Sequence, residues 1–229
     1  MMVIDFAAGH PVPTVFDGIA NTVALVVLLL EFGMLRAGLL RTQVRLYAGQ
    51  SLAVSVLAAV VAFGRGVPEL YALAGLSLLL KVVVVPLLVL SLLRDADEEI
   101  AGSGALGVAN EVLISIVVAA FGFFAVGVLD IHSNVLPATA LSLSIAVVLV
   151  AFILMVLRRD VVSQAIGFFS LENGVSLASL VVAAGMPLIL EVAFLFDLLV
   201  AVVVFGVLMR THHRRTRSLS TETLDQLRG

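Results

Sequence analysis

Seven long apolar stretches follow one another along this chain, and they constrain its fold more than any other feature of the sequence. A helix needs about 20 mainly apolar residues to cross the hydrocarbon core of a bilayer. Each stretch meets this length, and short segments bearing charges, glycine or proline separate them. The chain is therefore predicted to be an all-α, polytopic membrane protein with seven transmembrane helices, at residues 14–36, 41–63, 69–93, 105–129, 135–157, 161–184 and 187–209.

The composition supports a membrane environment. Hydrophobic residues make up 62% of the chain and charged residues only 13%, whereas a soluble domain carries about 25% charged residues. A chain this apolar cannot hide its surface from water by folding on itself, so lipid is its expected solvent. The prediction divides the chain into a membrane domain, residues 1–209, and a polar, basic tail, residues 210–229.

The basic residues predict an orientation. Of the 13 lysines and arginines, Arg65 falls on one side of the predicted helices and Lys81 within a helix, while the others share the opposite side. The positive-inside rule assigns the arginine-rich side to the cytoplasm. The N-terminus is then outside and the C-terminus cytoplasmic, as an odd number of helices requires. The expected location is the cell inner (plasma) membrane. The arginine-rich side holds Arg36, Arg41, Arg45, Arg94, Arg158, Arg159, Arg210, Arg214, Arg215, Arg217 and Arg228.

Acidic residues inside the apolar stretches are the first candidate functional groups, because a charge in hydrocarbon is costly and usually functional. Glu172 and Asp197 each lie about 15 Å from the start of their predicted helices. Since the hydrocarbon core is about 30 Å thick, both are expected near its middle. Glu191 is expected about 9 Å closer to the outer surface than Asp197. We expect these three carboxyl groups to form steps of a proton relay.

Three other charged residues within the predicted helices, Lys81, Glu111 and Glu31, need an explanation. Lys81 is again expected near mid-depth, and Glu111 enters its helix from the cytoplasmic side. Two interpretations of Lys81 and Glu111 remain open: membership of the relay, or a structural ion pair with each other. Glu31 lies near the cytoplasmic end of its helix, where contact with Arg36 or with lipid head groups is expected to explain it.

Proton transfer has a physical reason to use such residues. A low-dielectric site favours the neutral form of a carboxyl group, and a nearby cation opposes this effect. Moving the cation or changing the hydration therefore switches a carboxyl group between binding and releasing a proton. Direct transfer also requires hydrogen-bond distance or a bridging water. The candidate proton pathway consists of Glu172, Asp197, Glu191, Lys81 and Glu111.

Several segments resemble subunits of known membrane complexes. The segment at residues 158–175, with Gly167, Glu172 and Asn173, resembles the K subunit of respiratory complex I, and this likeness spans residues 135–209. The seven-helix layout is similar to component E of hydrogenase-4 and related group 4 membrane hydrogenases, including the formate hydrogenlyase type. The segments carrying that similarity are RLYAGQS (45–51), LLLKVVVVP (78–86), LENG (171–174) and GMPLILE (185–191).

The resemblance implies a small connecting subunit of a large, redox-driven, energy-converting and proton-translocating complex. Its implied partners are antiporter-like subunits and quinone-module-like or hydrogenase membrane subunits. The likeness to the K subunit implies that Glu172 is the first of two helix carboxylates. The second is Asp197 by local pattern, with Glu191 as the alternative. Lys81 and Glu111 lie outside that likeness.

No catalytic or electron-transfer site is expected in this chain. The four histidines show no metal-ligand spacing, there is no cysteine, and the sequence has no phosphate-binding glycine loop. We therefore expect no cofactor, no metal ion and no nucleic-acid partner, and we assign any oxidoreductase chemistry to the other subunits. A stand-alone secondary transporter and a non-catalytic assembly scaffold remain the alternatives to a proton-pathway subunit.

Overall fold

The computed structural model describes residues 15–65, 68–96, 100–101, 106–128 and 137–182, together with positions 203, 206 and 207. The relay candidates Glu191 and Asp197 and the tail at 210–229 lie outside the described residues. Of the predicted helix at 187–209, only the three isolated positions are described, and all three are helical. A Cβ atom added at Gly206 would lie 3.7 Å from Leu88 Cδ2, so this position lies beside α4 (Val85–Ala96).

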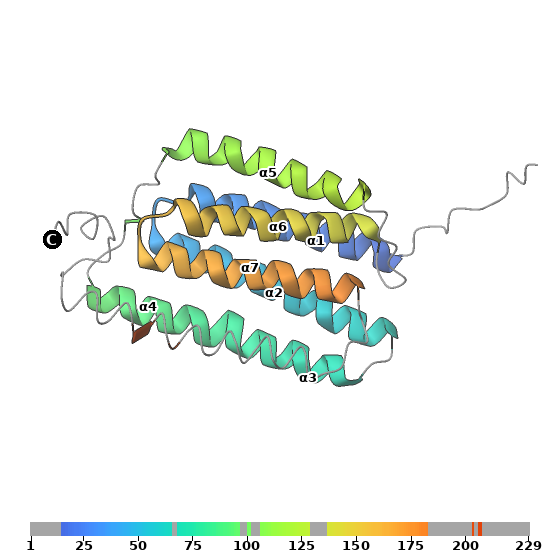
Figure 1. Ribbon diagram of the computed structural model, residues 1–229. Helices are drawn as coiled ribbons and strands as arrows, with labels where there is room; N and C mark the ends of the chain where they lie inside the picture. Colours follow the sequence, from blue (N-terminus) through green and yellow to red (C-terminus); the bar gives the residue numbers. More distant parts are fainter. Residues whose placement is uncertain are drawn as a thin grey trace, which may run out of the picture.

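The described residues contain six helices long and apolar enough to cross a membrane, which confirms an all-α, multi-pass membrane protein. They agree with the first six predicted helices, and the third span is a rod of three consecutive elements (Figure 1). The elements are α1 (Val15–Arg36), α2 (Leu40–Arg65), α3 (Pro68–Ser77), η1 (Leu78–Val84), α4 (Val85–Ala96), α5 (Val108–Val128), α6 (Ala138–Leu157) and α7 (Val161–Val182).

Two helices begin three residues later than predicted. The fourth span starts at Val108 rather than at 105, because Gly107 has φ +81° and so cannot continue a right-handed helix. The fifth starts at Ala138 rather than at 135, because Pro137 caps it in an extended conformation. In both cases the turn residue, rather than the hydrophobic pattern, sets the start of the helix.

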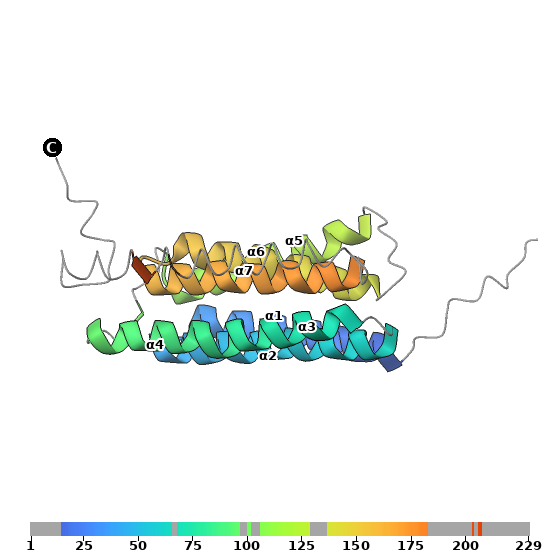
Figure 2. The ribbon, with the colours of Figure 1, turned by 90° about the horizontal axis from the view of Figure 1, so that it is seen from below.

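The six spans form two layers of three (Figure 2). One layer contains α1, α2 and the rod from α3 to α4, and the other contains α5, α6 and α7. Across the layers, α1 packs against α6 and α2 packs against α7. At the arginine-rich end, the backbone N–H of Ala101 donates to the carbonyl of Gly38 at 3.0 Å. This bond joins the α1–α2 connection to the segment before α5.

Close approach of α6 and α7 depends on two glycines of α7. A Cβ atom at Gly167 would lie 3.0 Å from the backbone nitrogen of Met155, and one at Gly174 would lie 2.8 Å from Val148 Cγ2. Small residues let helix backbones approach closely in membranes, where dispersion contacts hold helices together. The two glycines therefore fix one face of α7 against α6.

A π-helical turn interrupts the third span at η1, which ends two residues before Pro86. Proline has no backbone N–H, and its ring clashes with the carbonyl four residues earlier, so a regular α-helix is disfavoured there. The N–H of Val85 instead donates to the carbonyl of Leu80, five residues back. Lys81 lies inside this turn. Single π-helical turns in α-helices are frequent at functional sites.

Candidate proton-transfer site

Buried polar residues divide the apolar interior into two parts. One apolar cluster lies toward the arginine-rich end and a second toward the opposite end. On α1, α2, α7 and the third span, polar side chains that are almost completely buried lie between the two clusters. We call this set the polar layer. It consists of Glu31, Gln50, Ser51, Lys81, Ser170, Glu172 and Asn173.

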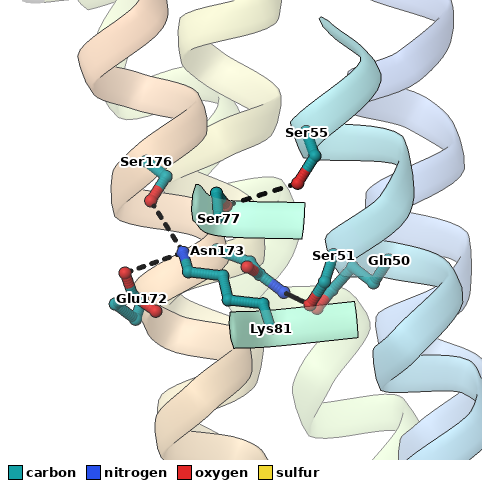
Figure 3. A network of polar contacts seen from close by, with 8 residues as sticks. All are labelled: Gln50, Ser51, Ser55, Ser77, Lys81, Glu172, Asn173 and Ser176. Carbon is teal, nitrogen blue, oxygen red and sulfur yellow. Dashed lines mark hydrogen bonds and ion pairs between the residues drawn. The ribbon is translucent and has the colours of Figure 1, made fainter. Parts of the chain in front are cut away.

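The centre of the polar layer is an ion pair between η1 and α7. Lys81 Nζ lies 2.7 Å from Glu172 Oε1 and donates a hydrogen bond to Ser176 Oγ at 3.1 Å (Figure 3). The exposed fraction of Lys81 is only 1% and that of Glu172 is 9%. An isolated charge in such a place would be strongly unfavourable, and the opposite charge reduces that cost.

A second cluster, around Glu31, joins α1 to α2 and α7. Gln50 Nε2 donates to Glu31 Oε2 at 2.8 Å, and the hydroxyl of Ser170 lies within hydrogen-bond reach of the same oxygen. Ser170 Oγ also lies 2.8 Å from Gln50 Oε1. A hydroxyl carries a single proton, so Ser170 can donate to only one of these two acceptors at a time. Its orientation therefore depends on whether Glu31 carries a charge.

Asn173 belongs to the Glu31 cluster and is the sequence neighbour of Glu172. Its Nδ2 atom donates to Ser51 Oγ at 2.8 Å and to Gln50 Oε1 at 3.1 Å, and the next residue back along α7 is Glu172 (Figure 3). Figure 3 also shows the hydroxyl of Ser55 pointing to that of Ser77, 3.3 Å away. Polar side chains thus continue past the ion pair toward the other end of the bundle.

The start of α7 is fixed by a cap. Asp160 Oδ1 accepts a hydrogen bond from the backbone N–H of Ser163 at 2.6 Å, as an N-cap residue does. Arg158, which is also buried, donates to the carbonyl of Leu35 at the end of α1. These contacts hold the arginine-rich end of α7 in register with α1, and so help to place Ser170 beside Glu31.

The structure separates the sequence-predicted residues into three groups. It brings Lys81 and Glu172 together. It places Glu111 apart from them, on the buried face of α5, where neither carboxyl oxygen has a hydrogen-bond partner among the described residues. The alternative of a structural ion pair between Lys81 and Glu111 is therefore wrong, because Lys81 pairs with Glu172. Glu191 and Asp197 are not among the described residues.

The expectation for Glu31 is also wrong. Its exposed fraction is 0%, and its partners are Gln50 and Ser170 rather than Arg36 or the membrane surface. The reason is that α2 and α7 present two polar side chains to the same point on α1. A signal was present in the sequence: Gln43, Tyr47, Gln50, Ser51 and Ser55 recur at the spacing of helical turns.

This arrangement is chemically suited to binding and passing protons. It contains two buried carboxyl groups, one cation on a four-carbon stem and several hydroxyl and amide groups, within one polar layer. It offers little for binding a metal ion: the described residues contain no group of three or more His, Cys, Asp or Glu side chains that would serve as ligands.

Comparison with known proteins shows a similarity that spans almost the whole chain. The chain is 23% identical over 211 residues to hydrogenase-4 component E of Escherichia coli K12, which covers 92% of this chain and 98% of that protein. The same component of Shigella flexneri matches to the same extent. The chain is also 41% identical to an uncharacterized protein of Mycobacterium tuberculosis over 95 residues, but this match spans only 40% of that protein.

No protein-family model matches the chain, and no solved structure matches it. The similarity to hydrogenase-4 component E nevertheless extends over almost the whole of both chains. It is therefore not confined to one part of the bundle that holds the six described spans and the Lys81–Glu172 pair. The chain is therefore a distant homologue of hydrogenase-4 component E.

Proposed function

We propose that this protein is the connecting, proton-pathway membrane subunit of a redox-driven, energy-converting complex of the membrane-bound hydrogenase type. The homology to a hydrogenase-4 component supports the class of complex. The observation that carries the proton pathway is the Lys81–Glu172 pair, buried halfway along its two spans. A likeness to the K subunit of complex I belongs to the same proposal.

The proposed chemistry is a switch between paired and unpaired states of Glu172. When Lys81 lies against it, the carboxylate is stabilised in its charged form. When the ammonium group moves away, the same carboxyl group favours binding a proton from its neighbours. Lys81 can make such a move because it lies in a π-helical turn and on a flexible stem. The redox reaction would supply the driving force through other subunits.

The remaining parts of the pathway follow from the sequence. We propose Asp197, with Glu191 as the alternative, as the next carboxyl group beyond Glu172, and Glu111 as a further member. The proposed orientation has the N-terminus outside and the tail at 210–229 in the cytoplasm, within the inner membrane. The proposed partners are antiporter-like subunits on one side and a hydrogenase or quinone-module-like membrane subunit on the other.

A second candidate function is a non-catalytic assembly scaffold, and the ion pair is the observation that favours it. A salt link of 2.7 Å can also hold η1 against α7 without exchanging protons. Redox-driven proton uptake in vesicles separates the two functions when Glu172 is replaced by glutamine. A proton-pathway subunit loses uptake in the Glu172→Gln complex, whereas a scaffold retains it.

A further inference from the structure

A stripe of polar side chains runs along one face of α2. It begins near the arginine-rich end of the bundle and continues past the depth of the ion pair. The residues are spaced by three or four positions, or by whole multiples of a turn, so they share a face of the helix. The first and last are about 18 Å apart along the helix axis, which is more than half of a hydrocarbon core of about 30 Å. All are buried: Gln43, Tyr47, Gln50, Ser51 and Ser55.

Serines of α7 follow this stripe in the same direction and with the same period. Ser163 donates to Gln43 Oε1 at 2.8 Å, and seven residues later on both helices Ser170 lies 2.8 Å from Gln50 Oε1. The two helices therefore run parallel in a common register. We call this line of contacts between the polar side chains of α2 and the serines of α7 the seam. Gln43 Nε2 also donates to the carbonyl of Ala37, in the connection between α1 and α2, so the seam reaches the arginine-rich end of the bundle.

Glu31 meets this seam from a third helix. It lies about 7 Å along α1 from Arg36, the last residue of that helix. Its serine partner on α7, Ser170, precedes Glu172 by two residues, or about 3 Å of helix. Glu31 thus lies between the arginine-rich end and the ion pair. Its contacts with Gln50 and Ser170 place a carboxyl group in the seam at this depth.

Glu31 Oε1 and Asn173 Oδ1 are buried acceptor atoms without a hydrogen-bond partner among the described residues. Buried polar atoms in folded proteins are nearly always hydrogen-bonded, and an exception calls for an explanation. A carboxyl group that takes up a proton at Oε1 becomes a donor there, while Oε2 keeps its bond from Gln50.

We propose that Glu31 is a proton-carrying group, and that the seam between α2 and α7 is the route by which protons pass between the arginine-rich end and Glu172. This inference rests on the proposed function. A proton entering along the seam binds the Glu31 carboxylate and makes it a neutral acid, and Ser170 then turns toward Gln50. The O–H bond of Glu31 next breaks as the proton passes, through water, to the Glu172 carboxylate. Glu31 is then charged again, and Glu172, from which Lys81 has moved away, is neutral.

The first test does not depend on pumping. Dicyclohexylcarbodiimide modifies protonated carboxyl groups in apolar surroundings, and mass spectrometry of the complex in native membranes locates the modified residue. We expect modification at Glu31 that falls as the pH of the medium rises, because a relay group exchanges its proton with the solution. Absence of modification at Glu31, or modification that does not change with pH, would overturn the proposal.

The second test compares proton uptake in vesicles that hold the whole complex. We expect Glu31→Gln and Ser170→Ala each to lower the rate of uptake at least about tenfold at equal electron flow, as loss of a positioned proton-transfer group does. The matched control is Ser144→Ala, since Ser144 is equally buried but, among the described residues, bonds only a carbonyl of its own helix, that of Leu141. It is expected to retain uptake.

The outcomes distinguish this inference from the proposed function. If Glu172→Gln abolishes uptake while Glu31→Gln and Ser170→Ala leave it intact, the route through Glu31 is rejected and the proposed function stands. If Glu172→Gln itself leaves uptake intact, the proposed function is rejected, and the route to Glu172 is rejected with it. If Glu31→Gln prevents assembly, Ser170→Ala and the labelling of the natural protein still decide the question.

Discussion

Lys81 and Glu172 lie at the midpoints of two 22-residue spans that run in opposite directions, and their charged atoms are 2.7 Å apart. This pairing holds two groups of opposite charge at a depth where neither is stable alone. The pair also connects the two layers of the bundle, because η1 belongs to one layer and α7 to the other. The same two side chains therefore hold the layers together and, in the proposed function, carry the proton switch.

Removing one member of the pair is expected to destabilise the fold. Lys81→Met leaves Glu172 buried without its cation, and such a change typically costs about 3–5 kcal/mol. The double variant Lys81→Met with Glu172→Gln leaves no uncompensated charge, so it is expected to recover most of that loss. The free energy of unfolding in mixed micelles checks this prediction. Equal stability of Lys81→Met and the double variant would show that Glu172 is not destabilised by the loss of its cation.

The π-helical turn is expected to control the position of Lys81. Pro86→Ala supplies a backbone N–H and removes the ring, so a regular α-helix becomes possible through η1. That change would turn Lys81 about the helix axis, away from Glu172. We therefore expect the coupling energy between Lys81 and Glu172 to fall when it is measured in the Pro86→Ala background. An unchanged coupling energy would mean that the turn does not depend on Pro86.

The glycines of α7 are expected to be intolerant of even one added methyl group. In Gly167→Ala the new Cβ would lie 3.0 Å from the backbone nitrogen of Met155 and 3.2 Å from the carbonyl oxygen of Ala151. Backbone atoms cannot move aside as a flexible side chain does, so a loss of about 1–3 kcal/mol in unfolding free energy is expected.

The matched control is Gly75→Ala. Gly75 is an exposed helical glycine, and a Cβ atom added there would meet no other atom within 4 Å. Alanine at this position is expected to be neutral or to stabilise the helix by up to about 1 kcal/mol. Destabilisation of the same size at positions 75 and 167 would contradict close packing of α6 on α7 as the cause.

The uneven distribution of arginines predicts the side of the membrane on which the tail lies. Eleven of the 13 basic residues share one side of the predicted spans, so residues 210–229 are expected in the cytoplasm. A C-terminal alkaline phosphatase fusion should be inactive and a C-terminal green fluorescent protein fusion should fluoresce. The reverse pattern would invert the proposed topology.

Hydrophobic pattern and turn residues were sufficient to predict six helices, because a span of the bilayer requires a long apolar run. Depth along the helix was sufficient to single out Glu172 and Lys81. The partner of each charge was harder to predict, since rotation of a helix about its axis depends on packing that a single sequence does not encode locally. From the sequence, Glu111 was one possible ion-pair partner of Lys81. In the structure, Lys81 lies in the π-helical turn and pairs with Glu172.

Glu31 shows the same difficulty. Its distance from Arg36 along the chain favoured a position at the membrane surface. The structure buries it because two partners, Gln50 from α2 and Ser170 from α7, converge on its carboxyl group from distant parts of the sequence. The polar stripe on α2 was visible at helical spacing, but its meaning depended on knowing which helices face it.

The most direct test of a proton pathway through this subunit is proton uptake by inverted membrane vesicles during redox-driven electron flow. Vesicles carrying the Glu172→Gln complex should assemble the same subunits and transfer electrons, yet take up protons at least about tenfold more slowly than the natural complex. Uptake at the natural rate, with Glu172 replaced and the complex intact, would show that Glu172 does not carry protons.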